Sequence, residues 1–359
     1  MIHVVTLPHT LLEKRYEWCA FTAKVWRFTK MMKMAGSPVT LYGPDIAADQ
    51  TRANAAEYVE VITAQDRLDW FGVPEWPSTH VFDRWDVSDV CWTESNRRFA
   101  AQIRKRWAPG DVVGIIGGGC QEQLLDELVD LKPLSVEWGI GYNGTIARTH
   151  KVYESYAWMH YLAGRTNDDD IKYFDTVIPN CFDLDDFTPR YEQPTDPYVL
   201  FMARPITRKG TDIVAAIAQR CSIPVKVAGQ PGTPIPGTEY IGILTGKQKY
   251  ETLANATALL SPSVYLEPFG GVAVEAMLSG TPVIATDWGA YTETVQNHVT
   301  GYRCRTLNDF QEAVRKARFL DRRTITDIAR SKYCLGVGAV QYRDYFNRLS
   351  TLYADGWYS

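Results

Sequence analysis

Two glutamates, Glu267 and Glu275, are separated by seven residues in the segment EPFGGVAVE. The apolar run 258–260 precedes this segment and a helical pattern follows it. We therefore expect Glu267 on a loop after a strand and Glu275 on the next helix. Carboxylates accept hydrogen bonds from hydroxyl groups, so this pair can bind the sugar and ribose hydroxyls of a nucleotide-sugar. Ordinary capping near a positive helix end is the alternative interpretation.

Between the two glutamates lies a glycine-rich turn that is expected to open the helix. Gly270 and Gly271 allow the backbone to come close to a ligand. The amides of Val272 and Ala273 follow at the positive end of the helix, where they can face a diphosphate. The segment therefore has the residue types needed to bind a sugar nucleotide along its length.

Short β-branched runs alternate with helical patterns along the chain, which predicts open parallel sheets covered by helices. Expected strands are 1–7, 39–42, 58–62, 112–116, 135–138, 177–178, 198–202, 224–228, 240–244, 258–260 and 282–285. Expected helices are 121–131, 211–221, 247–256, 271–279, 308–319 and 340–353. The fold class is therefore α/β, with two doubly wound Rossmann-like domains.

The chain has 359 residues, which is too long for one comfortable core and fits two domains. Prolines and aspartates interrupt the periodicity near 183–196. We predict an N-terminal domain over 1–182, a C-terminal nucleotide-sugar domain over 183–335, and a final helical segment over 336–359 that packs back on the first domain. Ligands of such sheets bind at the carboxyl ends of the strands, so two facing domains would form a central cleft.

Composition excludes several classes of protein. The formal charge is −4, and residues 1–180 hold 24 acidic against 19 basic residues, so neither half is globally cationic. Seven scattered cysteines lack a C-x-x-C pair, which favours reduced thiols and no zinc site. A charged leader and a long apolar segment are both lacking, and we expect a cytoplasmic protein, in a host cytoplasm if viral.

At this point the chain resembles the GT-B glycosyltransferases, in particular the retaining group called glycosyltransferase family four. The resemblance rests on the paired glutamates, on Gly280–Ala285 after them, on Arg204–Gly210 directly after a strand, and on Val177–Asp183. Together these motifs span residues 174–300. A weaker similarity of Glu137–Trp158 to glycosyltransferases of tailed phages indicates a possible origin.

The resemblance implies a retaining transfer from a UDP- or GDP-linked sugar, in which the departing phosphate oxygen takes the acceptor proton. It assigns Arg204 and Lys209 to the diphosphate and Glu267 to the sugar, and these three are the predicted catalytic residues. Backbone near Leu244 would contact the nucleobase. The transfer would need no metal and no cofactor, and no protein partner is inferred.

The first half departs from the family, because Pro8–Thr10 replaces the glycine pair that follows the first strand in many relatives. Acceptor-side candidates lie where strands end in this half, although a tight turn or a local hydrogen bond explains several of them as well. They are His9, Gly118, Gly119, Glu137 and Tyr142. The cluster Asp168–Asp170 has no companion ligand, and we interpret it as a solvated loop.

The sequence leaves two classes of acceptor open. Two basic groups on expected helices could contact DNA phosphates or an anionic membrane surface, and a solvated helix face is the third interpretation. They comprise Lys24, Arg27, Lys30 and Lys33, and Arg97, Arg98, Arg104, Lys105 and Arg106. A hydroxymethylated pyrimidine flipped out of phage DNA is narrowly favoured over a cell-surface glycan or lipid-linked saccharide.

Two further classes fit less well. A Rossmann oxidoreductase would need G-x-G-x-x-G after the first strand, and Met1–Leu7 is not followed by it. A binding protein without catalysis is the remote alternative.

Overall fold

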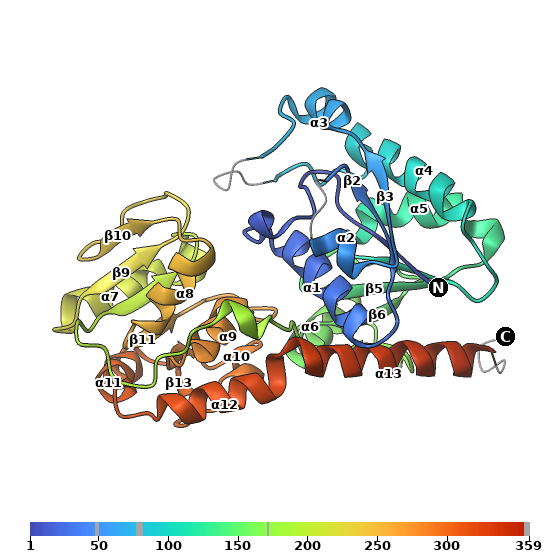
Figure 1. Cartoon of the computed structure of the whole chain (residues 1–359). Helices are drawn as coiled ribbons and strands as arrows, with labels where there is room; N and C mark the ends of the chain where they lie inside the picture. Colours follow the sequence, from blue (N-terminus) through green and yellow to red (C-terminus); the bar gives the residue numbers. More distant parts are fainter. Residues whose placement is uncertain (47–49, 77–81, 171, 355–359) are drawn as a thin grey trace. The chain divides into compact units, whose positions relative to one another are not determined.

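The computed structural model describes residues 1–46, 50–76, 82–170 and 172–354, and contacts divide the chain into two compact units. Unit 1 comprises residues 1–154, 166–179 and 335–359. Unit 2 comprises residues 155–165 and 180–334. Figure 1 traces the chain from the blue amino terminus to the red final helix.

Unit 1 is built on a parallel sheet of seven strands in the order β3-β2-β1-β4-β5-β6-β7. The order reverses at β1, which pairs with β2 on one side and β4 on the other. The loops that follow β1 and β4 therefore diverge at the carboxyl edge of this sheet. The strands are β1 (Ile2–Val5), β2 (Thr40–Pro44), β3 (Glu57–Ile62), β4 (Val112–Ile115), β5 (Leu134–Ile140), β6 (His150–Tyr153) and β7 (Thr176–Val177). Its helices are α1 (Ala20–Met34), α2 (Gln50–Asn54), α3 (Ala64–Phe71), α4 (Val90–Arg104), α5 (Glu122–Glu127) and α13 (Leu335–Ala354).

Unit 2 holds a second parallel sheet, with six strands in the order β10-β9-β8-β11-β12-β13. Its order reverses between β8 and β11, which pair directly. The strands are β8 (Val199–Met202), β9 (Val225–Ala228), β10 (Glu239–Gly242), β11 (Ala258–Ser261), β12 (Val283–Thr286) and β13 (Gly301–Cys304). The helices are α6 (Tyr156–Thr166), α7 (Thr211–Arg220), α8 (Gly246–Ala254), α9 (Gly271–Leu278), α10 (Tyr291–Thr294), α11 (Leu307–Ala317) and α12 (Arg322–Tyr333).

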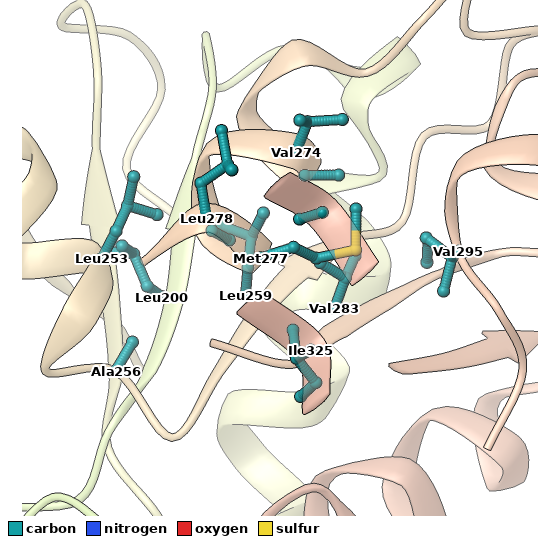
Figure 2. Close-up of a cluster of buried hydrophobic side chains, with 14 of the residues drawn as sticks. Leu200, Leu253, Ala256, Leu259, Val274, Met277, Leu278, Val283, Val295 and Ile325 are labelled. Carbon is teal, nitrogen blue, oxygen red and sulfur yellow. The ribbon is translucent and has the colours of Figure 1, made fainter. Parts of the chain in front are cut away.

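The core of unit 2 holds α9 against the sheet and against α12. Figure 2 shows Met277 and Leu278 of α9 among Leu259 of β11, Val283 of β12 and Ile325 of α12. All five side chains are at most 1% exposed. Burying apolar side chains of this size contributes about 1.5–3 kcal/mol each. The helix that carries Glu275 is therefore held rigidly on the strands that precede the glutamate motif.

The two α/β sheets confirm the predicted fold class, and the predicted strands and most predicted helices occur within about two residues of their expected bounds. Two helices differ. The final helix begins at Leu335, five residues before its expected start at 340. The helix expected over 121–131 is broken into α5 and short 3₁₀ turns on either side, because Gln121 and Leu128 depart from helical geometry. The short strands β6 and β13 escaped prediction. Each has only four residues with mixed polarity, which is a weak alternating pattern.

One segment lies in a different unit from the one predicted for it. Residues 155–165, expected within the first domain, pack in unit 2. The carboxylate of Glu293 accepts hydrogen bonds from the amides of Tyr156 (3.0 Å) and Ala157 (2.8 Å) at the start of α6. The hydroxyl of Ser155 donates to the carbonyl of Pro268 (2.6 Å). The first amides of α6 and the Ser155 hydroxyl thus find their hydrogen-bond acceptors far away in the sequence. A local sequence pattern does not reveal such contacts.

The final helix, α13, packs against α1 of unit 1 (Figure 1). Phe28 of α1 contacts the ring of Tyr342 edge-on at 4.9 Å and stacks on Trp138 of β5 at 4.2 Å. Aromatic burial of this kind is among the largest apolar contributions that single side chains make. The chain thus returns to its first unit after completing the second.

Candidate functional site

Two loops of unit 2 meet because β8 and β11 are neighbours in the sheet. The cation loop, residues 203–210, follows β8, and the acid loop, residues 262–270, follows β11. Ligands of doubly wound sheets bind at such a reversal of strand order. Two motifs more than fifty residues apart in the sequence are thereby brought to one edge of the sheet.

Lys209 and Glu267 form the central contact between these loops. The Lys209 ammonium lies 2.8 Å from Glu267 Oε2 and also donates to the hydroxyl of Tyr265 at 2.9 Å. The Ser263 hydroxyl donates to the same carboxylate oxygen at 3.0 Å. Glu267 is 8% exposed, so its charge is compensated by a paired lysine and two hydroxyl neighbours rather than by water.

Glu275 forms a second ion pair, one turn along α9. Its Oε1 accepts from the Lys249 ammonium of α8 at 2.9 Å, and Glu275 is 7% exposed. A carboxylate beside a bound phosphate would repel it, and each paired lysine removes that repulsion. Both predicted glutamates are therefore neutralised before any ligand binds.

The site carries an excess of positive charge. Four cations and two carboxylates give a formal charge of +2. The cations are Arg204, Arg208, Lys209 and Lys249. Arg204 and Arg208 are exposed on the cation loop. This excess suits a ligand with about two negative charges, such as a diphosphate.

The start of α9 shapes the floor of the site. Gly270 has φ +77°, and a Cβ there would lie 2.6 Å from the Tyr291 ring. The amide of Ala273 donates to the Gly270 carbonyl at 2.9 Å, so that amide, predicted to face a diphosphate, is already engaged. Gly271 and Val272 come before it, at positions where amides have no acceptor within a helix. They are the better donors toward an anion.

A small cavity of about 50 Å³ opens at this floor. Its lining includes Lys209, Glu267, Gly270, Gly271 and Val272, five of the residues predicted from the sequence. Leu244 lies elsewhere: it follows β10, is half-buried, and packs against the unit 2 core. Its predicted backbone contact with a base stays a prediction.

Four of the five acceptor-side candidates come together in unit 1, where they hold a loop. The Tyr142 hydroxyl donates to Glu137 Oε1 at 2.9 Å. The Gly119 amide donates to the Gly144 carbonyl at 2.9 Å. A Cβ on Gly118 would approach that same carbonyl to 2.8 Å. These glycines are therefore needed for close packing of the loop, which is the alternative that the sequence left open.

Glu137 is the most perturbed acid of this group. It is fully buried on β5, and Oε2 accepts from the Ile146 amide (2.9 Å) and the Thr149 hydroxyl (3.3 Å). Burial raises the pKa of Glu137 to about 7, against hydrogen bonds from Ile146 and Tyr142 that lower it. Its geometry is that of an internal anchor for the loop that follows β5.

His9, the fifth candidate, is buried in an aromatic assembly beyond β1. Its ring stacks on Phe82 with centres 4.0 Å apart, and its Nε2 lies 3.4 Å from the Cys19 thiol. Phe82 contacts Trp85 at 5.2 Å, and Phe21 bridges Trp85 (5.3 Å) to Tyr142 (5.4 Å). The assembly links His9 to Tyr142 through packed rings.

The predicted basic helix of unit 1 is largely neutralised. Four of its five cations pair with acids that are distant in sequence or one turn away. The pairs are Arg97–Glu94 (2.9 Å), Arg98–Asp66 (2.7 Å), Arg104–Asp130 (2.9 Å) and Arg106–Glu57 (2.7 Å). On α1, Lys24 pairs with Glu154 and donates to the Gly139 carbonyl at 2.9 Å. The group from Arg97 to Arg106 therefore does not form an uncompensated cationic surface.

The acidic cluster at 168–170 has a local explanation. Lys172 lies 3.4 Å from Asp168 and 4.0 Å from Asp170. Across residues 1–46, 50–76, 82–170 and 172–354, no three His, Cys, Asp or Glu side chains form a group suited to a metal. Within the same residues, no helix is both long enough and apolar enough to cross a membrane.

Four residues of the site were missed by sequence reasoning, and one of them, Arg208, lies within the predicted cation motif. Tyr265 and Ser263 lie beside the glutamate motif, and their polar groups two and four residues before Glu267 were a signal that could have been used. Lys249 had no such signal, because it reaches Glu275 from a separate helix.

Sequence comparison finds similarity to known proteins over parts of the chain. Residues 236–322 match the family described as glycosyl transferases group 1. An uncharacterized glycosyltransferase of Methanocaldococcus jannaschii is 39% identical over 62 residues, 17% of this chain and 16% of its own. A glycogen synthase of Mycobacterium tuberculosis is 34% identical over 103 residues, 25% of each chain. The matched segments thus span no more than about a quarter of these relatives.

Structural comparison extends over nearly the whole chain. Sucrose-phosphate synthase from Thermosynechococcus elongatus has a TM-score of 0.69 at 16% identity, with 97% of this chain and 98% of that chain covered. Anabaena HepE, solved with UDP and glucose, has a TM-score of 0.64 at 14% identity over 96% and 99%. These likenesses define the GT-B fold. The chain therefore has the GT-B fold, and its residues 236–322 are similar to the glycosyl transferases group 1 family.

Proposed function

We propose that the protein transfers a sugar from a UDP- or GDP-linked donor to a hydroxyl acceptor, with retention of anomeric configuration. The single observation that carries this proposal is the Lys209–Glu267 pair at the cavity beside the start of α9. It combines a cation for the diphosphate with a carboxylate that can accept from sugar hydroxyls. The UDP bound to the HepE structure is consistent with such a donor.

In the proposed reaction, the bond between the anomeric carbon and the phosphate oxygen breaks. The acceptor oxygen bonds to the same face of that carbon, and its proton passes to the departing phosphate. Negative charge grows on the diphosphate, and Arg204, Lys209 and the amides of Gly271 and Val272 would stabilise it. These groups supply fixed positive charge, so we propose that no metal and no cofactor is required.

A panel of nucleotide-sugars tests the donor half of this proposal. We expect release of UDP or GDP from at least one donor, and loss of release in Glu275→Ala while the variant stays folded by circular dichroism. Turnover in the presence of EDTA tests metal independence, and NMR of the product's anomeric proton tests retention. Full release by Glu275→Ala would contradict the site.

The proposal for the acceptor rests on the charge of unit 1. The ion pairs of Arg97, Arg98, Arg104 and Arg106 remove most of the support for contacts with DNA phosphates or an anionic membrane. We therefore favour a neutral saccharide hydroxyl over hydroxymethylated phage DNA, which reverses the narrow preference drawn from the sequence. Incubation with hydroxymethylcytosine DNA, followed by mass spectrometry of its nucleosides, tests the choice between the two acceptors. A gain of one hexose mass would restore the DNA acceptor.

The cytoplasmic location stays a prediction.

A further inference from the structure

Tyr265 of the acid loop faces the cation loop, and two cations lie against its ring. The Arg208 guanidinium carbon is 4.5 Å from the ring centre, and the Lys209 ammonium is 4.9 Å from it. Burial raises the pKa of Tyr265, Glu267 raises it further, and the positive charges of Arg208 and Arg204 oppose that rise. Arg208 and Lys209 therefore both lie close enough to the phenol to act on it.

The hydroxyl of Tyr265 completes a ring of polar contacts. It accepts from Lys209 at 2.9 Å and hydrogen-bonds with Glu267, the partner that Lys209 also contacts. One side chain thus touches the lysine at its hydroxyl and the arginine at its face. Tyr265 is half-buried, so its aromatic surface is shielded from water on part of its area.

The backbones of the two loops are joined at the same place. The Val264 amide donates to the Arg208 carbonyl at 3.0 Å. A Cβ on Gly210 would lie 2.0 Å from the Pro262 carbonyl oxygen, and Gly210 has φ +78°, so the loops approach as closely as glycine allows. Movement of Arg208 relative to Tyr265 is therefore restrained in both main chain and side chain.

We propose that Tyr265 is the positioning residue of the diphosphate site and that Arg208 is its third cation, beside Arg204 and Lys209. This inference rests on the proposed function. Long cationic side chains are mobile, and a clamp is effective only if its charges are fixed where negative charge will develop. The aromatic face orients the Arg208 guanidinium, whose planar fork can donate two hydrogen bonds to one phosphate.

The proposal separates two functions of one side chain, so two substitutions test it. Tyr265→Phe keeps the ring for Arg208 and removes the hydroxyl that holds Lys209. We expect kcat for donor cleavage to fall roughly tenfold, with a smaller change in the Kd of the nucleoside diphosphate. Tyr265→Leu removes both contacts, and we expect the Kd for UDP or GDP to rise by about tenfold as well.

Tyr198→Phe is the matched control. Tyr198 lies just before β8, at the opposite edge of the same sheet. Its hydroxyl donates to the Thr252 carbonyl at 2.6 Å, and the Lys226 ammonium lies 4.3 Å from its ring centre. Tyr198→Phe thus also removes a hydroxyl hydrogen bond and keeps a cation against the ring, at a place away from the site. We expect it to change the melting temperature about as much as Tyr265→Phe and to leave turnover unchanged.

A double-mutant cycle separates positioning from a merely structural role. If Tyr265 acts through Lys209, then Tyr265→Phe has little further effect on turnover in a Lys209→Met background. Arg208→Met should raise the Kd of the nucleoside diphosphate several-fold, and Arg208→Lys should restore only part of it, because an ammonium lacks the planar fork.

Three outcomes decide the result. Wild-type protein that binds neither UDP nor GDP and cleaves no donor would contradict the proposed function itself. Wild-type activity with unchanged turnover and Kd in Tyr265→Leu would overturn only the positioning role. Additive losses in the Lys209→Met cycle, with Tyr198→Phe equally impaired, would show that Tyr265 acts through general stability.

Discussion

The carboxyl edges of the two sheets hold similar residue types in opposite states. In unit 2, Glu267 and Glu275 are paired with lysines on a cavity-lining loop and helix, beside exposed guanidiniums. In unit 1, Glu137 is fully buried and accepts three hydrogen bonds from the loop that follows its own strand. A carboxylate at a strand end can thus serve a ligand or serve the fold. The difference lies in whether its partners are mobile cations or neutral groups of the chain.

This contrast predicts that substitutions in unit 2 change turnover and that substitutions in unit 1 change stability. The largest effect is expected for Lys209→Ala. Loss of its charge from the departing diphosphate should lower the rate of donor cleavage by on the order of 10²–10³. Lys209→Arg keeps the charge and should retain part of the activity. Equal rates of donor cleavage in wild type and Lys209→Ala would contradict the prediction that substitutions in unit 2 change turnover.

The next largest effect is the pH dependence of folding stability that Glu137 produces. Burial raises its pKa to about 7 from 4.5, so between these values the folded protein holds a proton that the unfolded chain has lost. Stability contributed by this proton is present below about pH 4.5 and is lost as pH rises through 7, by on the order of 3 kcal/mol.

Glu137→Gln cannot titrate and tests this prediction directly. Urea unfolding at pH 5 and pH 7.5 should show a smaller loss of stability for the variant than for wild type, while donor cleavage per folded molecule stays the same. A steeper loss in the variant would contradict the assigned protonation.

A smaller effect is expected for Lys249→Met. This variant leaves the buried carboxylate of Glu275 without its cation, and we expect the KM for the donor to rise about tenfold with a small change in kcat. Lys247→Met is the control, since Lys247 is 88% exposed and pairs with Glu251 on the same helix. A similar KM shift in both variants would point to α8 as a whole rather than to the ion pair.

The smallest effect is expected for Arg104→Ala and Arg106→Ala in unit 1. Each removes one half of an ion pair with an exposed acid, and exposed pairs contribute little to stability because water screens them. Melting temperature and donor cleavage should both stay close to wild type. Loss of acceptor transfer with intact donor cleavage would instead show that this helix contacts a charged acceptor.

Much of the fold was readable in the sequence. The β-branched runs predicted most strands, because a parallel sheet buries both faces of a strand and leaves a continuous apolar run. The glycine turn and the acids at 267 and 275 predicted a binding corner, because a helix start and its flanking carboxylates form a local arrangement.

Other features depended on residues far apart in the chain. Tyr265 and Lys249 became part of the site only when the two loops and α8 were brought against α9. The basic groups of unit 1 suggested DNA until their acid partners were known, and Asp66, Asp130 and Glu57 come from three separate segments. Residues 155–165 joined unit 2 through Glu293, more than one hundred residues later.

The sequence by itself determined the α/β class, most of the strands, and the chemical types available at residues 204–209 and 267–275. Those properties follow from periodicity and from contacts within a few residues. Only the tertiary structure decided which charges meet, because the adjacency of β8 and β11 places two distant loops at one edge. The net charge at a site depends on which residues are neighbours in space. Those neighbours distinguish the lysine-paired acids of unit 2 from the anchoring acid of unit 1.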